Sequence, residues 1–215
     1  MLNKTRKPLL KEVILSKKLS WLLRHGAAKE GINIQADGFI KVSDILQHPN
    51  YRRDFNMNIL RQIVDNDAKQ RYTLRKHPVE GHFEIRANQG HSLLEVKADE
   101  CLQPITKASE VPLAVHGTYY RHWPGIKAEG LKRFTRNHIH FATSDDASDN
   151  ISGFRSNCQI LIYLDTKKLL DEGCLKLFRS DNSVILCSGL PHDGSIPSKY
   201  FLKVVDRKTG QLLEL

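Results

Sequence analysis

The sequence predicts an α+β protein with two differently built parts. Residues 11–65 place apolar side chains at helical spacing, and residues 71–86 then alternate as two strands do. From residue 111 onward short apolar strands dominate. Between the two parts the pattern weakens, and Pro104 and Pro112 bracket a linker. We therefore expect a first domain over residues 1–95, a linker over 96–110 and a second domain over 111–215.

The first domain should contain three helices. The first is expected over residues 11–26, with its apolar face formed by Val13, Ile14, Leu19, Trp21, Leu22 and Leu23. A short strand over residues 39–42 precedes the second helix, which Ser43 could cap, and the third covers residues 56–65. Three helices followed by a β-hairpin is the order of a winged-helix module. Such modules often bind nucleic acid, although some serve protein contacts.

The second domain should be a β-rich α+β domain that begins with an apolar strand directly before His116. A helix over residues 123–130 should end at its glycine. The remaining elements are strands over 139–142, 159–165, 184–188 and 201–206 and a short helix over 166–173.

The charge of the chain points to an anionic partner. The net charge is +9, and residues 1–100 hold 18 of the 33 Lys and Arg but 12 of the 24 Asp and Glu. The excess positive charge therefore lies mainly in the first half. Charge alone does not choose among nucleic acid, nucleotide and acidic protein.

The four cysteines are widely spaced, which favours reduced thiols in a cytoplasmic protein over a disulfide or zinc site. No Cys/His spacing is typical of a metal site, and no apolar run of about 18 residues could span a membrane. We expect no metal, no membrane partner and a monomer.

Three polar blocks in the first half are candidates for binding phosphate, because arginine forks and imidazoles are suited to that task. Arg24 and His25 close the first helix, where cations also cap helix ends. Arg71 opens a strand after Lys69 and could instead be a solvated charge. The block over 86–92 is too polar for a core and could instead be a hydrogen-bonded loop. Its candidate ligands are Arg86, Gln89, His91 and Ser92.

Two blocks in the second half resemble a nucleotide site. His116, Gly117 and Thr118 follow a buried strand, and glycine permits close backbone approach, although a strand-end turn is the commoner meaning. Arg136, His138 and His140 share one strand face by alternation, with Ile139 opposite. Arg155 would add a phosphate donor. P-loop and Rossmann glycine patterns do not occur.

Seven stretches in this order resemble the NAD-dependent RNA 2'-phosphotransferase family of the KptA type. They are L-S-W-L-L-R-H-G, D-G-F-I-K-V, D-A-K-Q-R-Y, I-R-A-N-Q-G-H-S, H-G-T-Y, G-L-K-R-F-T-R-N-H-I-H-F and V-I-L-C-S-G with I-P-S-K-Y-F. They cover residues 12–203. The resemblance implies a winged-helix lobe followed by a lobe like that of ADP-ribosyltransferases.

The resemblance also implies a two-step reaction that consumes NAD as co-substrate. The RNA 2'-phosphate attacks the nicotinamide ribose and expels nicotinamide. The ribose O2'' then attacks phosphorus, which yields 2'-OH RNA and ADP-ribose 1'',2''-cyclic phosphate. The implied partner is RNA with an internal 2'-phosphate, as at a tRNA splice junction.

We assign three overlapping sets of residues on this basis. The catalytic set is Arg24, His25, Arg71, His116 and Arg136. The NAD-binding set is His116, Gly117, Thr118, His138, His140 and Arg155. The RNA phosphate set is Arg24, His25, Lys69, Arg71, Arg86, Gln89, His91 and Ser92.

Because the arginines are divided between the halves, we expect both halves to supply cations to one cleft. Two other functions stay open at this stage. One is an ADP-ribosyltransferase that modifies nucleic-acid phosphate ends and stops after the first step. The other is a winged-helix RNA-binding protein without activity.

Overall fold

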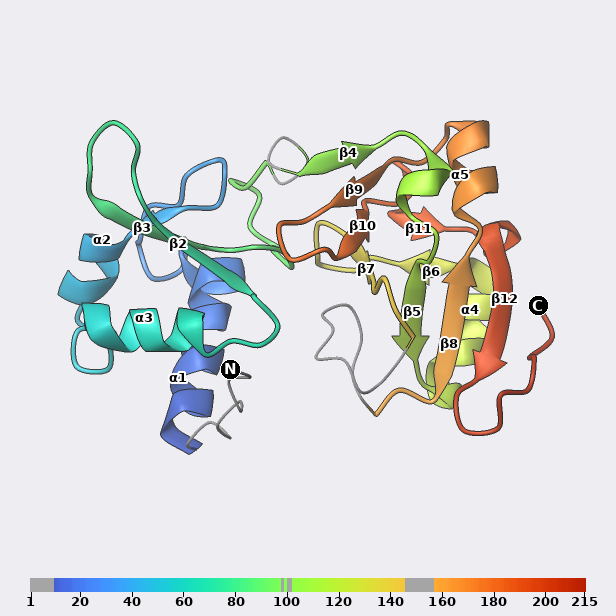
Figure 1. Cartoon of the computed structure of the whole chain (residues 1–215), viewed down its shortest axis with the longest axis horizontal. Helices are drawn as coiled ribbons and strands as arrows, with labels where there is room; N and C mark the ends of the chain where they lie inside the picture. Colours follow the sequence, from blue (N-terminus) through green and yellow to red (C-terminus); the bar gives the residue numbers. More distant parts are fainter. Residues whose placement is uncertain (1–9, 98, 100–101, 146–156) are drawn as a thin grey trace, which may run out of the picture. The chain divides into compact units, whose positions relative to one another are not determined.

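The computed structural model describes residues 10–97, 99, 102–145 and 157–215. Contacts divide the chain into two compact units, Met1–Glu100 and Cys101–Leu215. Both units combine helices with small antiparallel sheets (Figure 1), so the α+β class is confirmed. Within the described ranges, every helix is too short or too polar to cross a membrane.

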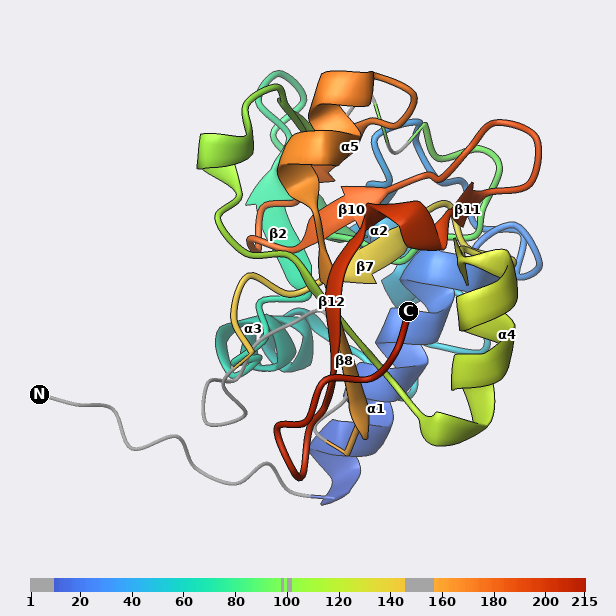
Figure 2. The same cartoon turned by 90° about the vertical axis from the view of Figure 1, so that its right-hand side faces the viewer.

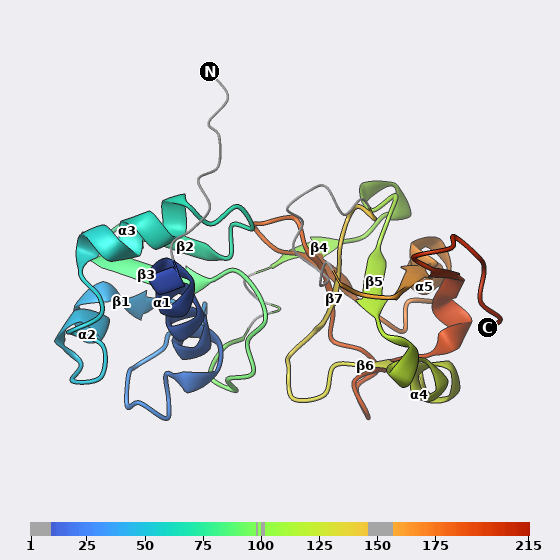
Figure 3. The ribbon, with the colours of Figure 1, turned by 90° about the horizontal axis from the view of Figure 1, so that it is seen from below.

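The N-terminal unit is built from helices packed on one small sheet. Its elements are α1 (Leu10–Trp21), the π-helical turn η1 (Leu22–Gly26), β1 (Ile40–Lys41), α2 (Val42–Gln47), α3 (Met57–Asp65), β2 (Tyr72–Lys76) and β3 (Phe83–Ala87). The sheet is antiparallel in the order β1-β3-β2. Helices α1 and α3 are in contact, and Figure 3 shows them side by side.

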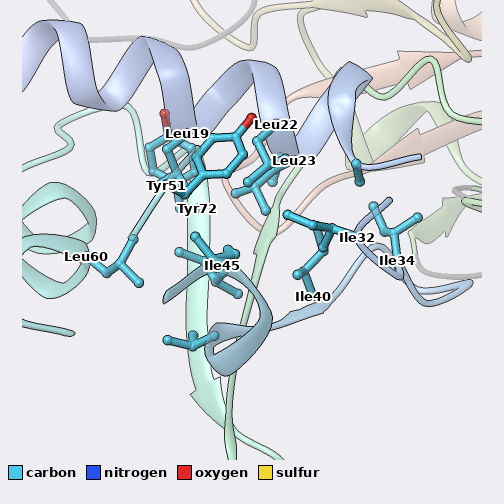
Figure 4. Close-up of a cluster of buried hydrophobic side chains, with 14 of the residues drawn as sticks. Leu19, Leu22, Leu23, Ile32, Ile34, Ile40, Ile45, Tyr51, Leu60 and Tyr72 are labelled. Carbon is cyan, nitrogen blue, oxygen red and sulfur yellow. The ribbon is translucent and has the colours of Figure 1, made fainter. Parts of the chain in front are cut away.

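The core of this unit lies between the helices and one face of the sheet. Leu19, Leu22 and Leu23 meet Tyr72, Leu60 and Ile45 there (Figure 4). Ile85 and Ala87 face this core, because alternate side chains of a strand point to one side. The tyrosine also donates its hydroxyl proton to the carbonyl oxygen of Ser16, at 2.8 Å.

The first helix differs from its expected form in two respects. Leu15 is buried, whereas Ile14 and Trp21 are exposed, so the apolar face is rotated from the expected one. The last residues, through Gly26, form a π-helical turn in place of α-helix.

The C-terminal unit contains two main sheets, ordered β4-β9-β10-β7 and β12-β8-β5, and the pair β11-β6. Its strands are β4 (Gln103–Ile105), β5 (Val115–Thr118), β6 (Leu131–Lys132), β7 (Ile139–Phe141), β8 (Ile160–Leu164), β9 (Leu177–Arg179), β10 (Ile185–Cys187), β11 (Ser195–Ile196) and β12 (Phe201–Asp206). Its helices are α4 (Trp123–Glu129) and α5 (Thr166–Glu172), with the short 3-10 turns η3 (Ala108–Glu110), η4 (Tyr120–His122) and η5 (Ser198–Tyr200).

The two main sheets of this unit are joined where β5 meets β7. Val115 forms an antiparallel bridge with Ala142, just beyond the end of β7. The helix α4 lies along one side of the sheet formed by β5, β8 and β12 (Figure 2), and its Trp123 and Ile126 pack on the core. Strand β4 lies inside the segment expected as a linker and pairs with β9 at the sheet edge, the position that tolerates its proline.

Helix capping corrects one sequence prediction. Ser43 does not cap α2, because its hydroxyl donates to the Asp44 carboxylate and Lys41 holds the N-cap position without a side-chain bond. In α3, by contrast, Asn56 is the N-cap and its side-chain oxygen accepts from the backbone N–H of Ile59 at 2.9 Å.

Removing the α3 cap should therefore destabilise the protein. We expect Asn56→Ala to lower the free energy of unfolding by about 1 kcal/mol, because the first turn loses an acceptor for one of its N–H groups. Urea unfolding followed by circular dichroism measures this change. The matched control is Ser43→Ala, which should leave stability within about 0.5 kcal/mol of the wild type. Equal losses in the two variants would contradict this reading of the caps.

Candidate functional site

Arg24 and His25 lie on η1, directly after α1. Leu22 and Leu23 of the same turn are fully buried, whereas Arg24 and His25 are partly exposed. Single π-helical turns are frequent at functional sites. The leucines thus fix the turn in the core and leave the Arg24 and His25 side chains partly exposed.

Ser92 holds the loop after β3 against this turn. Nδ1 of His25 lies 2.8 Å from Oγ of Ser92, and the backbone N–H of Ser92 donates to the carbonyl oxygen of Arg24 at 3.0 Å. The second bond satisfies a carbonyl at the helix end, where intrahelical donors are lacking. Residues 68 positions apart in the sequence are thereby joined in one site, which we call the Arg24 cluster.

Gly90 brings the backbone of this loop close to the Arg24 side chain. A Cβ atom on Gly90 would lie 3.3 Å from Nε and 3.5 Å from Cζ of Arg24. The φ angle of Gly90 is +89°, a conformation that side chains rarely adopt. The backbone conformation therefore favours glycine here, and a side chain would also push the Arg24 side chain away by a few tenths of an ångström.

Asp67 fixes Arg71 through both its main chain and its side chain. The backbone N–H of Arg71 donates to Oδ2 of Asp67 at 2.6 Å, and Nη1 forms an ion pair with Oδ1. Burial lowers the pKa of Lys69, and the adjacent Arg71 lowers it further, while Asp67 acts in the opposite direction. The charge of Arg71 thus disfavours the protonated form of Lys69, and a nearby anion would favour it.

Asn88 connects Arg71 to the loop of the Arg24 cluster. Its backbone N–H donates to the carbonyl oxygen of Arg71 at 2.8 Å, its amide donates to that of Gln70 at 2.7 Å, and its side-chain oxygen accepts from Thr73 at 2.6 Å. Asn88 and Asp67 hold Arg71 in place, although neither is among the site residues predicted from the sequence. The only signal available was their place in the polar blocks.

Gln89 has a buried side-chain oxygen with no hydrogen-bond partner among the described residues. Its side chain is 8% exposed, and its Oε1 has no hydrogen-bond partner. A buried carbonyl oxygen without a hydrogen-bond donor destabilises the folded state. A bound ligand or a water molecule could supply that donor.

Arg86 and His91 face a different part of the N-terminal unit. Nη1 of Arg86 donates to the carbonyl oxygen of Asp37 at 3.2 Å, and its guanidinium lies 4.8 Å from the centre of the Phe39 ring. His91 is buried beside Gly38, where a Cβ atom would lie 3.2 Å from its Nε2. Their contact with RNA phosphate stays a prediction.

Gly26 ends this turn in close contact with an aromatic ring. It is buried, and a Cβ atom there would overlap the ring of Trp21. Its role is to let that ring pack over the π-helical turn.

In the C-terminal unit, His116, Gly117 and Thr118 lie inside β5, so the expectation that they follow the strand is wrong. Thr118 is buried and its carbonyl oxygen accepts from the backbone N–H of Gln159 at 2.8 Å. The strand continues through His116 because β8 pairs with it along its whole length.

His116 is held in one tautomer. Its Nδ1 lies 2.9 Å from the carbonyl oxygen of His140, which can only accept, so Nδ1 carries the proton. Burial lowers the pKa of His116, and the charge of Arg136 lowers it further. The imidazole is therefore neutral near pH 7, and Nε2 is a hydrogen-bond acceptor. We call His116, Arg136 and His140 the His116 cluster.

Arg136 is not part of a strand row. It lies in the turn before β7, where its carbonyl oxygen accepts from Nη1 of Arg133 at 2.9 Å and its side chain is exposed.

The alternation expected around Ile139 is confirmed, because Ile139 and Phe141 enter the main core. His138 and His140 are both buried, and the His138 ring meets Phe178 edge to face with centroids 6.2 Å apart.

Arg155 lies outside the described residues. In the parts of the chain that the structure describes, no group of three or more His, Cys, Asp or Glu side chains could hold a metal ion.

The chain thus presents arginine and histidine side chains around η1 in one unit and a neutral histidine acceptor in a strand of the other. Residues 10–189 match the family described as RNA 2'-phosphotransferase, Tpt1/KptA family. The chain is 40% identical to tRNA 2'-phosphotransferase 1 of Danio rerio over 181 residues, 83% of this chain and 79% of the fish protein. It is also 40% identical to the protein of that name from Homo sapiens over 208 residues, 95% of this chain and 80% of the human one.

A third relative is tRNA 2'-phosphotransferase of Saccharomyces cerevisiae, 35% identical over 186 residues, 84% of this chain and 80% of the yeast protein. The chain belongs to the RNA 2'-phosphotransferase family, which is a family of transferases. The family recognised from the sequence is confirmed.

Glycine at position 90 should matter more for activity than for stability. We expect Gly90→Ala to reduce 2'-phosphate removal from RNA by at least tenfold, because the new methyl group displaces the Arg24 guanidinium. The positive φ should also cost about 1 kcal/mol of stability. Activity assays on 2'-phosphorylated RNA and thermal unfolding measure the two effects.

Gly81→Ala is the matched control. Gly81 has a φ of +71° and nothing within 4 Å of its Cβ position, so it carries the same backbone strain without a neighbour to displace. It should lose similar stability and keep its activity. If both variants lost activity equally, strain alone would explain the effect.

Proposed function

We propose that the protein transfers the 2'-phosphate of a tRNA-like RNA to NAD, giving 2'-OH RNA, nicotinamide and ADP-ribose 1'',2''-cyclic phosphate. Family membership and relatives named tRNA 2'-phosphotransferase support the RNA substrate. The observation that carries the proposal is the Arg24 cluster, in which Ser92 fixes His25 and the Arg24 backbone while Gly90 lies against the Arg24 side chain.

In this proposal the N-terminal unit has a winged-helix architecture and binds the RNA phosphate. Helices α1, α2 and α3 with the antiparallel sheet β1-β3-β2 support this architecture. Arg24, His25 and Arg71 neutralise the 2'-phosphate and the adjacent diester, with Lys69 beside them. Arginine suits this task because its planar fork binds two phosphate oxygens at once.

The C-terminal unit has, in this proposal, the architecture of an ADP-ribosyltransferase and binds NAD. The neutral Nε2 of His116 can accept a hydrogen bond from a ribose hydroxyl, whereas the oxygens of an ionised pyrophosphate have no hydrogen to donate. The residues present therefore fit a ribose better than a pyrophosphate at this atom. Gly117, Thr118, His138 and His140 complete the proposed NAD-binding set.

When bound, NAD would supply a ribose carbon from which nicotinamide can depart. The charge of Arg136 lowers the pKa of His116, which supports a role for Arg136 in the same proposed site. Its guanidinium would stabilise negative charge on the phosphate that is transferred in the second step.

Product analysis tests the proposed function. Mass spectrometry of a short 2'-phosphorylated RNA incubated with NAD and the enzyme should show 2'-OH RNA, nicotinamide and the cyclic phosphate. A stable ADP-ribosylated RNA from the wild type would instead identify an enzyme that stops after the first step. Absence of any product would reject both activities.

The same assay should separate the roles of two arginines. We expect Arg136→Ala to slow the second step by about 10²–10³, the loss typical of a donor aimed at a transition state. ADP-ribosylated RNA should then accumulate on a denaturing gel. Arg24→Ala serves as the comparison and should slow both steps without accumulation. Slow turnover of Arg136→Ala with no ADP-ribosylated RNA would refute the assignment to the second step.

The neutral state of His116 predicts a pH dependence. Because its pKa is lowered below the ordinary value of about 6.5, the KM for NAD should be constant from pH 8 to 6.5 and rise as the pH falls further. Protonation of Nε2 would remove the acceptor. Steady-state kinetics at constant ionic strength measure this profile.

His116→Ala should raise the KM for NAD and abolish its acid dependence, while RNA binding stays nearly intact. Equal losses of NAD use and RNA binding would mean that His116 is structural.

A further inference from the structure

The turn between β6 and β7 exposes an aromatic side chain. Phe134 is 83% exposed, the most of any aromatic residue in the described part of the chain. It stands two residues before Arg136, which the proposed function places at the transferred phosphate. A single exposed phenylalanine is no hydrophobic patch, so a large apolar partner does not explain it.

Phe134 is also held in an unfavourable backbone conformation. Its φ angle is +53°, which is a genuine outlier for a bulky residue. Such strain persists only where the surrounding structure fixes it, and it clusters at functional sites.

Arg133, the residue before Phe134, holds the backbone of this turn in place. The backbone N–H of Arg133 donates to the carbonyl oxygen of Gly194 at 3.1 Å, and its Nη1 donates to that of Arg136. A Cβ atom on Gly194 would overlap the Arg133 side chain, so the two lie in close contact. The turn is therefore anchored on both sides of Phe134, and the ring is presented to solvent by a fixed backbone.

The charge around the ring is positive. Lys132, Arg133 and Arg136 flank Phe134 in the sequence. Glu129 offsets the charge of Lys132 through an ion pair, so the positive charge next to Phe134 in the sequence comes from Arg133 and Arg136. An exposed planar ring among cations is the combination that binds single-stranded RNA, because bases stack on the ring while cations meet the backbone.

We infer that Phe134 is a stacking platform for a nucleobase of the RNA substrate, at or next to the nucleotide that carries the 2'-phosphate. This inference rests on the proposed function and adds to it a residue that holds the RNA on the C-terminal unit. Stacking is tolerant of base identity, so the platform would orient the RNA without reading its sequence.

The inference predicts a selective change in substrate binding. Phe134→Ala should raise the KM for 2'-phosphorylated RNA about tenfold, which corresponds to about 1.4 kcal/mol at 25 °C. The KM for NAD should not change. Phe134→Trp should keep the wild-type KM, and Phe134→Leu should behave as the alanine variant, because leucine has no planar face. Leu202→Ala, which removes an exposed side chain on β12, is the control and should change nothing.

Abasic substrates locate the stacked base. Three RNAs lack the base of the 2'-phosphorylated nucleotide, of its 5' neighbour or of its 3' neighbour. For one of these RNAs, the KM of the wild type should be about tenfold higher than for the intact RNA. Phe134→Ala should not raise the KM for that RNA any further. If the losses multiplied for all three RNAs, or if only the KM for NAD rose, the inference would be wrong. Wild-type inactivity on every 2'-phosphorylated RNA would instead refute the proposed function.

Strain at Phe134 gives an independent readout. Phe134→Gly should raise the Tm while it raises the KM for RNA, because glycine adopts a positive φ without cost. A lower Tm in the glycine variant would show that the ring supports the fold and is not held out for a ligand.

Discussion

Ser92 holds the loop after β3 against η1 with both its hydroxyl and its backbone N–H, and the N-terminal site depends on this contact. The core fixes η1 through Leu22 and Leu23, and the sheet fixes the start of the loop through β3. Two rigid elements therefore meet at Ser92. With Gly90 beneath the Arg24 side chain, the position of the guanidinium is set by the fold before any anion binds. Such preorganisation reduces the cost of ordering the site at the moment of binding.

In the C-terminal unit the candidate site is also fixed before any ligand binds, and here strands rather than a helix end fix it. The carbonyl oxygen of His140 selects the tautomer of His116, and burial keeps the ring neutral. A hydrogen bond to the backbone thus decides which ring nitrogen can accept a hydrogen bond from a ligand. This contact exists because β5 and β7 come together at the bridge between Val115 and Ala142.

Both sites carry unfavourable features that the surrounding fold maintains. The charge of Arg71 acts on Lys69, the charge of Arg136 acts on His116, and the Gln89 side-chain oxygen is buried without a partner. Phe134 adds backbone strain to an exposed apolar ring. Natural sequences depart from local consistency mainly at functional sites, and here the departures coincide with residues assigned to RNA and NAD.

The sequence by itself determined the class of fold, the family and the composition of the polar blocks. Helical spacing located α3, and alternation located the hairpin of β2 and β3, because each period reports directly which side of an element is buried. The N-cap of α2 was misassigned, since Ser43 could bond either to the backbone or to its neighbour Asp44, and sequence cannot rank the two.

Only the tertiary structure decided which blocks act together. It joined His25 to Ser92, turned Arg86 toward Phe39 and moved Arg136 from a strand to an exposed turn. The physical reason is that hydrogen bonds between residues distant in the chain, and the approach of a side chain to a glycine, depend on the packing of whole elements. Spacing along the sequence records only the local periods.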